Sequence, residues 1–133
     1  MAALNSERSG TMLDSYVACV SAKDVTSLEP LLGDAPLFEI PFLKPNRLVG
    51  RREILAAHVA MFASVDRFEF DLAEPLCDAH RAMAHGFLSV LRGKDTLRHE
   101  IGLVTEWSDG RIVRLSLYGD ARNVRPWSDV TIL

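Results

Sequence analysis

The 133-residue sequence lacks the features that mark several large classes of protein. Its two cysteines, Cys19 and Cys77, are too few for a disulfide framework and lie far from any C-x-x-C spacing. No apolar run approaches the roughly 20 residues that a membrane-spanning helix needs. Residues 1–10 contain no apolar stretch of the kind that signal peptides carry. We therefore expect a cytoplasmic protein whose two thiols are reduced.

Motifs for nucleic acids, nucleotides and metals are also absent. Lysine and arginine form no run or stripe, and the formal net charge is −3, so we expect no nucleic-acid partner. No phosphate loop or dinucleotide motif is present. The four histidines have no i, i+4 spacing, and no acidic residues cluster with them. We therefore expect no metal site and no cofactor.

The sequence does contain the composition and periodicity of one folded unit. We expect residues 1–10 to be a flexible leader and residues 11–133 to form a single domain, since 48% of the chain is hydrophobic. Apolar spacing predicts a helix from Thr11 and a second helix capped by Asp24. Pro30 predicts that this second helix is short, kinked or partly 3₁₀.

The helical part of the chain is followed by a second half with the period-two pattern of strands. Gly33 is expected to end the second helix, and a third helix is predicted after Gly50. A short extended piece is expected at 37–42. From residue 67 the period changes to two, which is typical of half-buried strands. Strands are predicted at 67–72, 81–92, 96–107 and 111–119.

Asp109-Gly110 is the strongest local signal, because this dipeptide is typical of a two-residue hairpin turn. The turn predicts which residues face each other across the two strands. The predicted pairs are Trp107 with Ile112, Thr105 with Arg114, Leu103 with Ser116, Ile101 with Tyr118, and His99 with Asp120. This face is half apolar and half polar, which suits the lining of a pocket. A bulge in either strand would shift the register.

Strand 81–92 is apolar on both faces, so we expect it to be central in the sheet. Met83, His85, Phe87 and Ser89 share one face of this strand. The opposite set is assigned to a convex face that forms a homodimer, because a monomer would expose it as an apolar patch. That set is Ala82, Ala84, Leu88, Val90, Val104, Val113, Leu115 and Leu117.

Helices on one side of an antiparallel sheet make an α+β fold. Several short motifs occur in a fixed order along the chain. They are Tyr16-Val17-Ala18, A-K-D at 22–24, Glu39-x-Pro41, Gly50-x-x-x-Ile54, Gly110-x-Ile112-Val113 and Leu117-Tyr118-Gly119. From about Met12 to Val124 the chain thereby resembles ketosteroid isomerase. The resemblance implies the cone-shaped nuclear transport factor 2-like fold, shared with SnoaL-type polyketide cyclases. In that fold three N-terminal helices pack on a strongly bent sheet that encloses a pocket, and many members are homodimers. The resemblance also implies that the face of strand 81–92 carrying Met83, His85, Phe87 and Ser89 lines this pocket.

The resemblance also implies what this chain cannot do. Isomerases of this kind use an aspartate base, with a tyrosine and a protonated aspartate as the oxyanion hole. The tyrosine position is occupied by Tyr16, but the base position falls on Ile40 and the second acid position near Leu103. Neither side chain can transfer a proton, so steroid isomerisation by that mechanism is excluded. The paired aspartates and arginine of the epoxide hydrolases also have no clear match.

We expect a cofactor-free acid–base enzyme of the isomerase, cyclase or dehydratase class, acting on a hydrophobic cyclic or carbonyl-bearing small molecule. The alternative is a non-catalytic ligand-binding or protein-interaction module on the same fold. The candidate catalytic residues are Tyr16, His85, His99 and Asp120. The candidate substrate-binding residues are Phe38, His58, Phe62, Met83, Phe87, Leu103, Trp107, Arg114, Ser116 and Tyr118.

Several of these residues also have a purely structural interpretation. Tyr16 could pack the first helix onto the sheet, and His58 could be a core histidine bonded to a backbone carbonyl. Arg114 could lie at a solvated rim. The pair His99–Asp120 would make His99 a usable general acid–base, but it could equally be a half-exposed ion pair at a sheet end.

Overall fold

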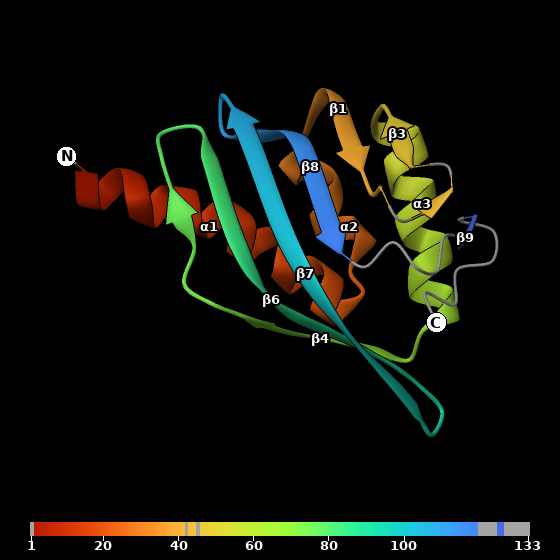
Figure 1. The fold of residues 1–133 in the computed structure, drawn as a ribbon. Helices are drawn as coiled ribbons and strands as arrows, with labels where there is room; N and C mark the ends of the chain where they lie inside the picture. The colour runs from red at the N-terminus through yellow and green to blue at the C-terminus, as the bar shows by residue number, and fades with distance from the viewer. Residues whose placement is uncertain (1, 42, 45, 120–124, 127–133) are drawn as a thin grey trace.

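A curved sheet with helices along one face makes up most of the structure, which is a computed structural model describing residues 2–41, 43–44, 46–119 and 125–126 (Figure 1). The helices are α1 (Ala2–Ala22), α2 (Val25–Leu28), the 3₁₀ helix η1 (Glu29–Leu31) and α3 (Arg51–Ser64). The strands are β1 (Leu32–Glu39), β2 (Leu43–Lys44), β3 (Arg47–Val49), β4 (Arg67–Leu72), β5 (Leu76–Cys77), β6 (Arg81–Arg92), β7 (Asp95–Ser108), β8 (Arg111–Gly119) and β9 (Arg125–Pro126).

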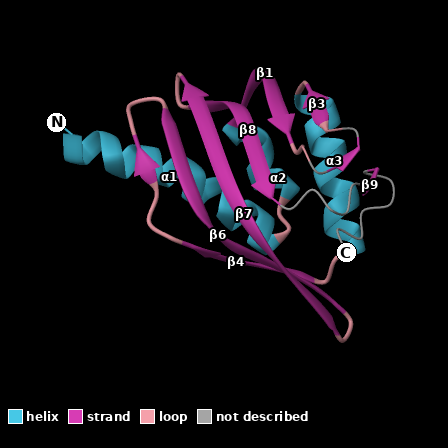
Figure 2. Ribbon diagram, viewed as in Figure 1, coloured by secondary structure: helices cyan, strands magenta, loops and turns pink. Residues whose placement is uncertain are grey.

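The main sheet has the order β3-β1-β8-β7-β6-β4, and β5 adds to β6. Helices α1 and α2 lie against one face of this sheet, as Figure 2 shows, and α3 packs against β1. The predicted α+β fold class is confirmed. The sheet is mixed, because β1 runs parallel to β8 while β4, β6, β7 and β8 form the predicted antiparallel meander.

The first helix is longer than the sequence pattern indicated. α1 begins at Ala2, so residues 2–10 are helical and Thr11 lies inside the helix instead of capping it. The physical reason is propensity: the first ten residues contain no proline and several good helix formers. The helix ends one residue before Lys23, which has a positive φ of 54°.

The second helix follows the prediction at its start and departs from it at its end. The backbone N–H of Ser27 donates to Asp24 Oδ1 at 3.0 Å, which is the predicted N-cap. Pro30 lies in the first turn of η1, so the helix is short and finishes in 3₁₀ geometry as expected. Gly33 does not end the helix; it belongs to β1, where it packs close to the carbonyl oxygen of Ile112.

The bounds of β6 and β8 match the prediction, but the two faces of β6 are exchanged. Ala82 and Ala84 are buried, as are Leu88 and Val90, whereas Met83 and His85 are exposed. Period-two alternation separates the faces without stating which one meets the helices. The predicted dimer face is therefore largely the helix-covered, concave face of the sheet.

The β7–β8 hairpin keeps its predicted turn and loses its predicted register. Trp107 pairs with Ile112 as expected, but the register shifts between Glu106 and Trp107. Beyond this bulge the pairs are Glu106 with Arg114, Thr105 with Leu115, Val104 with Ser116, Leu103 with Leu117, Gly102 with Tyr118 and Ile101 with Gly119. Leu115, Leu117 and Gly119 thus take the inner positions that were predicted for Arg114, Ser116 and Tyr118. Asp120, the predicted partner of His99, lies outside the described residues.

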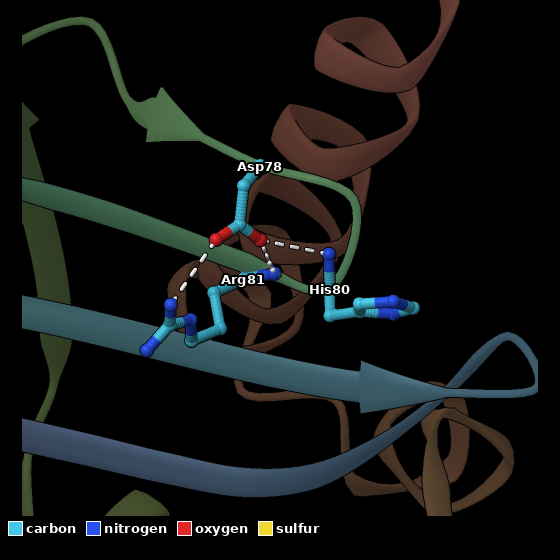
Figure 3. A network of polar contacts seen from close by, with 3 residues as sticks. All are labelled: Asp78, His80 and Arg81. Atoms are coloured by element: carbon cyan, nitrogen blue, oxygen red, sulfur yellow. Dashed lines mark hydrogen bonds and ion pairs between the residues drawn. The ribbon is translucent and has the colours of Figure 1, made fainter.

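The turn between β5 and β6 is held by one carboxylate. Asp78 Oδ1 accepts hydrogen bonds from the backbone N–H groups of His80 and Arg81, each at 2.8 Å. Its other oxygen pairs with the Arg81 guanidinium at 3.2 Å (Figure 3). These bonds lower the pKa of the Asp78 carboxyl. His80 itself is exposed.

Candidate functional site

The concave face of the sheet and the helices enclose a small apolar cavity. Its volume is about 30 Å³, which is room for about one water molecule. Its lining is Tyr16, Val20, Phe38, Ile40, Met61, Phe68, Phe70, Leu88, His99, Ile101, Leu103 and Leu117. Within this lining, Tyr16 and His99 carry the polar side-chain atoms.

Four of the predicted site residues meet at this cavity. Tyr16, Phe38, His99 and Leu103 come from α1, β1 and β7, and all of them line it. Ile40, where the isomerase resemblance would place the base, lines it as well. The two positions where that resemblance expects acids therefore do face the cavity, and both are apolar.

Five other predicted residues lie on the opposite face of the sheet. Met83 and Tyr118 are about half exposed, at 49% and 48%, and His85 is exposed beside them. Phe87 lies beneath the Arg98 guanidinium, 3.8 Å from it, and Arg114 pairs with Glu39 and Glu106. The exchanged faces of β6 and the bulge in the β7–β8 hairpin account for these differences.

Three more of the predicted residues are buried but do not line the cavity. Phe62 and Trp107 belong to the core without lining the cavity. Ser116 is buried at an outward position of β8, opposite Val104.

His58 fixes the hydroxyl of Tyr16. The Nδ1–H of His58 donates to the carbonyl oxygen of Ile54 at 2.7 Å, and Nε2 lies 2.9 Å from the Tyr16 hydroxyl oxygen. Because a carbonyl only accepts, Nδ1 carries the proton. Burial lowers the pKa of His58 to about 4, so Nε2 is unprotonated near neutral pH and accepts from the Tyr16 O–H. Burial also raises the pKa of the Tyr16 hydroxyl.

Aromatic rings hold this imidazole in place. Phe38 stacks on His58 with ring centroids 5.1 Å apart, and Phe62 and Tyr16 approach it edge-on. His58 is fully buried. This is the core histidine bonded to a backbone carbonyl that the sequence left as one alternative. Both ring nitrogens are in use, so His58 is a support for Tyr16 rather than a free base.

His99 is placed differently. It lies on β7 opposite Leu88, and its Nε2 is buried without a hydrogen-bond partner among the described residues. An unpaired buried polar group of this kind costs about 1–3 kcal/mol. His99 also borders an open surface hollow lined by His85, Phe87 and Tyr118. His99 is intermediate in exposure, so this residue contributes both to the enclosed cavity and to the surface of the protein.

The chemistry of the lining is limited to these groups. The lining that the structure describes contains no carboxylate and no guanidinium. No cluster of histidine, cysteine, aspartate or glutamate in the described ranges could hold a metal ion. Among the described helices, none is long and apolar enough to cross a membrane.

Several lining residues were not singled out by sequence reasoning. Phe68 and Phe70 lie on the inner face of β4, and their alternation with charged residues was the signal that could have found them. Met61 comes from the buried face of α3. Ile101 and Leu117 come to the cavity through the observed register of the hairpin.

No family model matches the sequence, and no curated protein matches it significantly. Solved structures do match. An LEH-like epoxide hydrolase from M. tuberculosis is 19% identical, with 88% of this chain and 86% of that chain covered and a TM-score of 0.77. A protein assigned to the SnoaL-like polyketide cyclases, from Shewanella denitrificans, is 13% identical, with 85% and 90% covered and a TM-score of 0.75. A nuclear transport factor 2-like protein of unknown function from Cytophaga hutchinsonii is 12% identical, with 84% and 88% covered and a TM-score of 0.65.

This chain has the nuclear transport factor 2-like fold. The predicted resemblance is confirmed at the level of the fold. At these identities the likeness does not carry a reaction to this chain, because one fold hosts many chemistries.

Proposed function

We propose that this nuclear transport factor 2-like protein is a cofactor-free acid–base enzyme in which His99 moves a proton on a small apolar molecule, cyclic or carbonyl-bearing. The observation that carries the proposal is the unpaired, buried Nε2 of His99 in a cavity otherwise lined by hydrocarbon. Imidazole both accepts and donates protons near neutral pH. A ligand atom placed in this cavity would provide the hydrogen-bond partner that the described residues do not.

The other titratable groups fit a supporting role. His58 is held in one tautomer by Ile54, and its pKa of about 4 makes it a poor base. Tyr16 keeps its proton, since burial raises its pKa. The reaction would thus depend on one imidazole, with Tyr16 as a neutral polar contact. This arrangement differs from the two acids and one tyrosine of the isomerases.

The size of the cavity restricts the substrate. A volume of about 30 Å³ admits a ligand only when lining side chains move. Met61 has a long unbranched side chain that adapts to irregular space, and its movement would enlarge the cavity. A small ring compound fits these limits better than a steroid.

A second candidate is a binding module that performs no chemistry. The apolar side chains of Ile40 and Leu103 favour it, because they occupy the cavity positions where the isomerase resemblance expects acids. The two candidates make different demands on His99. An enzyme needs its proton transfer, whereas a binding module needs at most its hydrogen bond.

The test is deuterium incorporation from D₂O into the α-carbons of cyclopentanone and cyclohexanone, followed by NMR. We expect the wild-type protein to accelerate exchange and His99→Gln to abolish the acceleration. His85→Gln is the matched control, since it changes an exposed histidine on the other face of the neighbouring strand. Exchange that survives in His99→Gln would overturn the proposal. Binding without any exchange would establish the binding module instead.

A further inference from the structure

The Tyr16 hydroxyl has one proton, and the hydrogen bonds of His58 determine which atom accepts it. His58 Nδ1 must donate, because its partner is the carbonyl oxygen of Ile54 at 2.7 Å. The other ring nitrogen then has only a lone pair to offer, and it lies 2.9 Å from the Tyr16 oxygen. Tyr16 therefore donates to His58. Its oxygen keeps its remaining lone-pair capacity and no second proton.

The packing opposes any reversal of this arrangement. His58 is fully buried between Phe38 and Phe62, so a flipped ring would move Nδ1 away from Ile54 and leave the ring N–H without its acceptor. If the Tyr16 O–H rotated toward the cavity, Nε2 of His58 would lose its donor. An unpaired buried group costs about as much as the new hydrogen bond would gain.

We infer that Tyr16 acts in the cavity as a hydrogen-bond acceptor, and that it selects apolar ring compounds carrying a hydroxyl or N–H donor. This rests on the proposed function in one respect, namely that the cavity admits the substrate. A carbonyl oxygen placed against Tyr16 meets lone pairs and is disfavoured. A hydroxyl in the same place donates to the Tyr16 oxygen without disturbing the bond to His58.

The inference also assigns different roles to the two polar groups of the lining. Tyr16 recognises the donor on the ligand, and His99, on β7, remains available for the proton that is transferred. The substrate class that satisfies both is a small ring ketone that also carries a hydroxyl or N–H group.

The experiment compares cyclopentanol with cyclopentanone, which share a carbon skeleton and differ in the polar group. Dissociation constants are measured by NMR titration of the full chain. We expect the wild-type protein to prefer the alcohol by roughly two- to tenfold, the range that one neutral hydrogen bond provides. Tyr16→Phe should bring the two affinities together, and His85→Gln, which changes an exposed residue on the other face of the sheet, should keep the preference.

A second variant tests the direction of the hydrogen bond. His58→Phe removes the acceptor and frees the Tyr16 proton to point into the cavity, so the preference should move toward the ketone. If this variant does not fold, as judged by circular dichroism, Tyr16→Phe alone decides. Equal affinities in the wild-type protein, a preference that survives in Tyr16→Phe, or no binding of either compound would each overturn the inference.

The failure of this inference is distinguishable from the failure of the proposed function. An alcohol preference that depends on Tyr16, without His99-dependent deuterium exchange, would support the inference and overturn the proposed enzymatic function. Exchange that depends on His99 without an alcohol preference would do the opposite.

Discussion

The Tyr16 hydroxyl and His58 Nε2 lie 2.9 Å apart and join helices α1 and α3 inside the core. Tyr16→Phe leaves this nitrogen buried without its donor, so we expect a loss of about 1–3 kcal/mol of unfolding free energy in urea denaturation. Tyr118→Phe is the control, since that hydroxyl belongs to a half-exposed side chain and its loss should change little. Combining Tyr16→Phe with His58→Phe should cost less than the sum of the two single changes. Additive losses would mean that the two groups do not interact.

The same histidine predicts how stability depends on pH. The pKa of His58 falls from 6.5 to about 4 on folding, so between these values the unfolded chain binds more protons than the folded one. Unfolding free energy therefore rises with pH in this window: the contribution is complete above pH 6.5 and is lost as the pH falls toward 4. The full effect is about 3 kcal/mol.

Urea denaturation at a series of pH values measures this effect. Subtracting the curve for His58→Phe removes the part that carboxylates contribute, and the difference should slope upward from pH 4 to 6.5. A flat difference curve for His58→Phe would contradict the buried neutral imidazole.

The elements of this fold were predictable because local chemistry specifies them. Asp24 caps its helix, Pro30 shortens it, and Asp109-Gly110 forms the hairpin turn, each through contacts within a few residues. The start of α1 was missed because Thr11 offered a plausible cap while the preceding residues had enough propensity to extend the helix.

The faces of the sheet were not predictable in the same way. Strand β6 is apolar on both sides, so alternation alone could not decide whether Ala84 or His85 meets the helices. In the bulge next to Trp107, Val113 is the extra residue on β8, so the residues after it face the opposite side from the one predicted. A valine gives no local signal of a bulge, as a glycine or proline would have done. The candidate site was therefore predictable in part: Tyr16 and His99 reach the cavity, whereas Met83, His85 and Phe87, the β6 residues assigned to the site, do not.

Gly86 on β6 should be required for the close pairing of β4 with β6. A Cβ atom at Gly86 would lie 2.1 Å from the carbonyl oxygen of Asp71 and 2.8 Å from Leu72 Cα. Both are backbone atoms, so they cannot move as a side chain would. We expect Gly86→Ala to lower the free energy of unfolding by at least about 2 kcal/mol, because the added methyl group would push β4 and β6 apart.

The control for this change is a glycine on the next strand. A Cβ at Gly102 would meet Tyr118 Cβ at 3.9 Å, an ordinary contact. Gly102→Ala should therefore change the unfolding free energy by less than about 0.5 kcal/mol. Equal effects of the two substitutions in urea denaturation would refute the steric argument.

Steroid isomerisation should be absent. Ile40 and Leu103 line the cavity where the isomerase resemblance expects acids, and the Tyr16 proton is held by His58. We expect no acceleration of 5-ene-3-keto steroid isomerisation, followed by the absorbance of the conjugated product. Ile40→Asp places a carboxylate in the lining and is the informative gain-of-function variant. A wild-type rate that depends on Tyr16 would show that the mechanism assigned to this tyrosine is incorrect.

The homodimer remains a prediction, now on different residues. The apolar set that first motivated it is mostly buried against the helices, but Met83, Val104 and Tyr118 lie on the outer face of the sheet. Met83 pairs with Val104 across β6 and β7, and Tyr118 is on the adjoining strand, so the three form one patch. Contiguous exposed apolar patches mark interaction surfaces more often than scattered side chains do.

Analytical ultracentrifugation tests this surface directly. We expect a dimer for the wild-type chain and a shift to monomer for Met83→Glu, because a dimer would bury the introduced carboxylate without a partner. Val59→Glu is the matched control: Val59 is comparably exposed, at 52%, but lies on α3 away from the sheet face. A wild-type monomer at micromolar concentration would remove the dimer altogether. Dissociation by Val59→Glu and not by Met83→Glu would move the interface to the helical side.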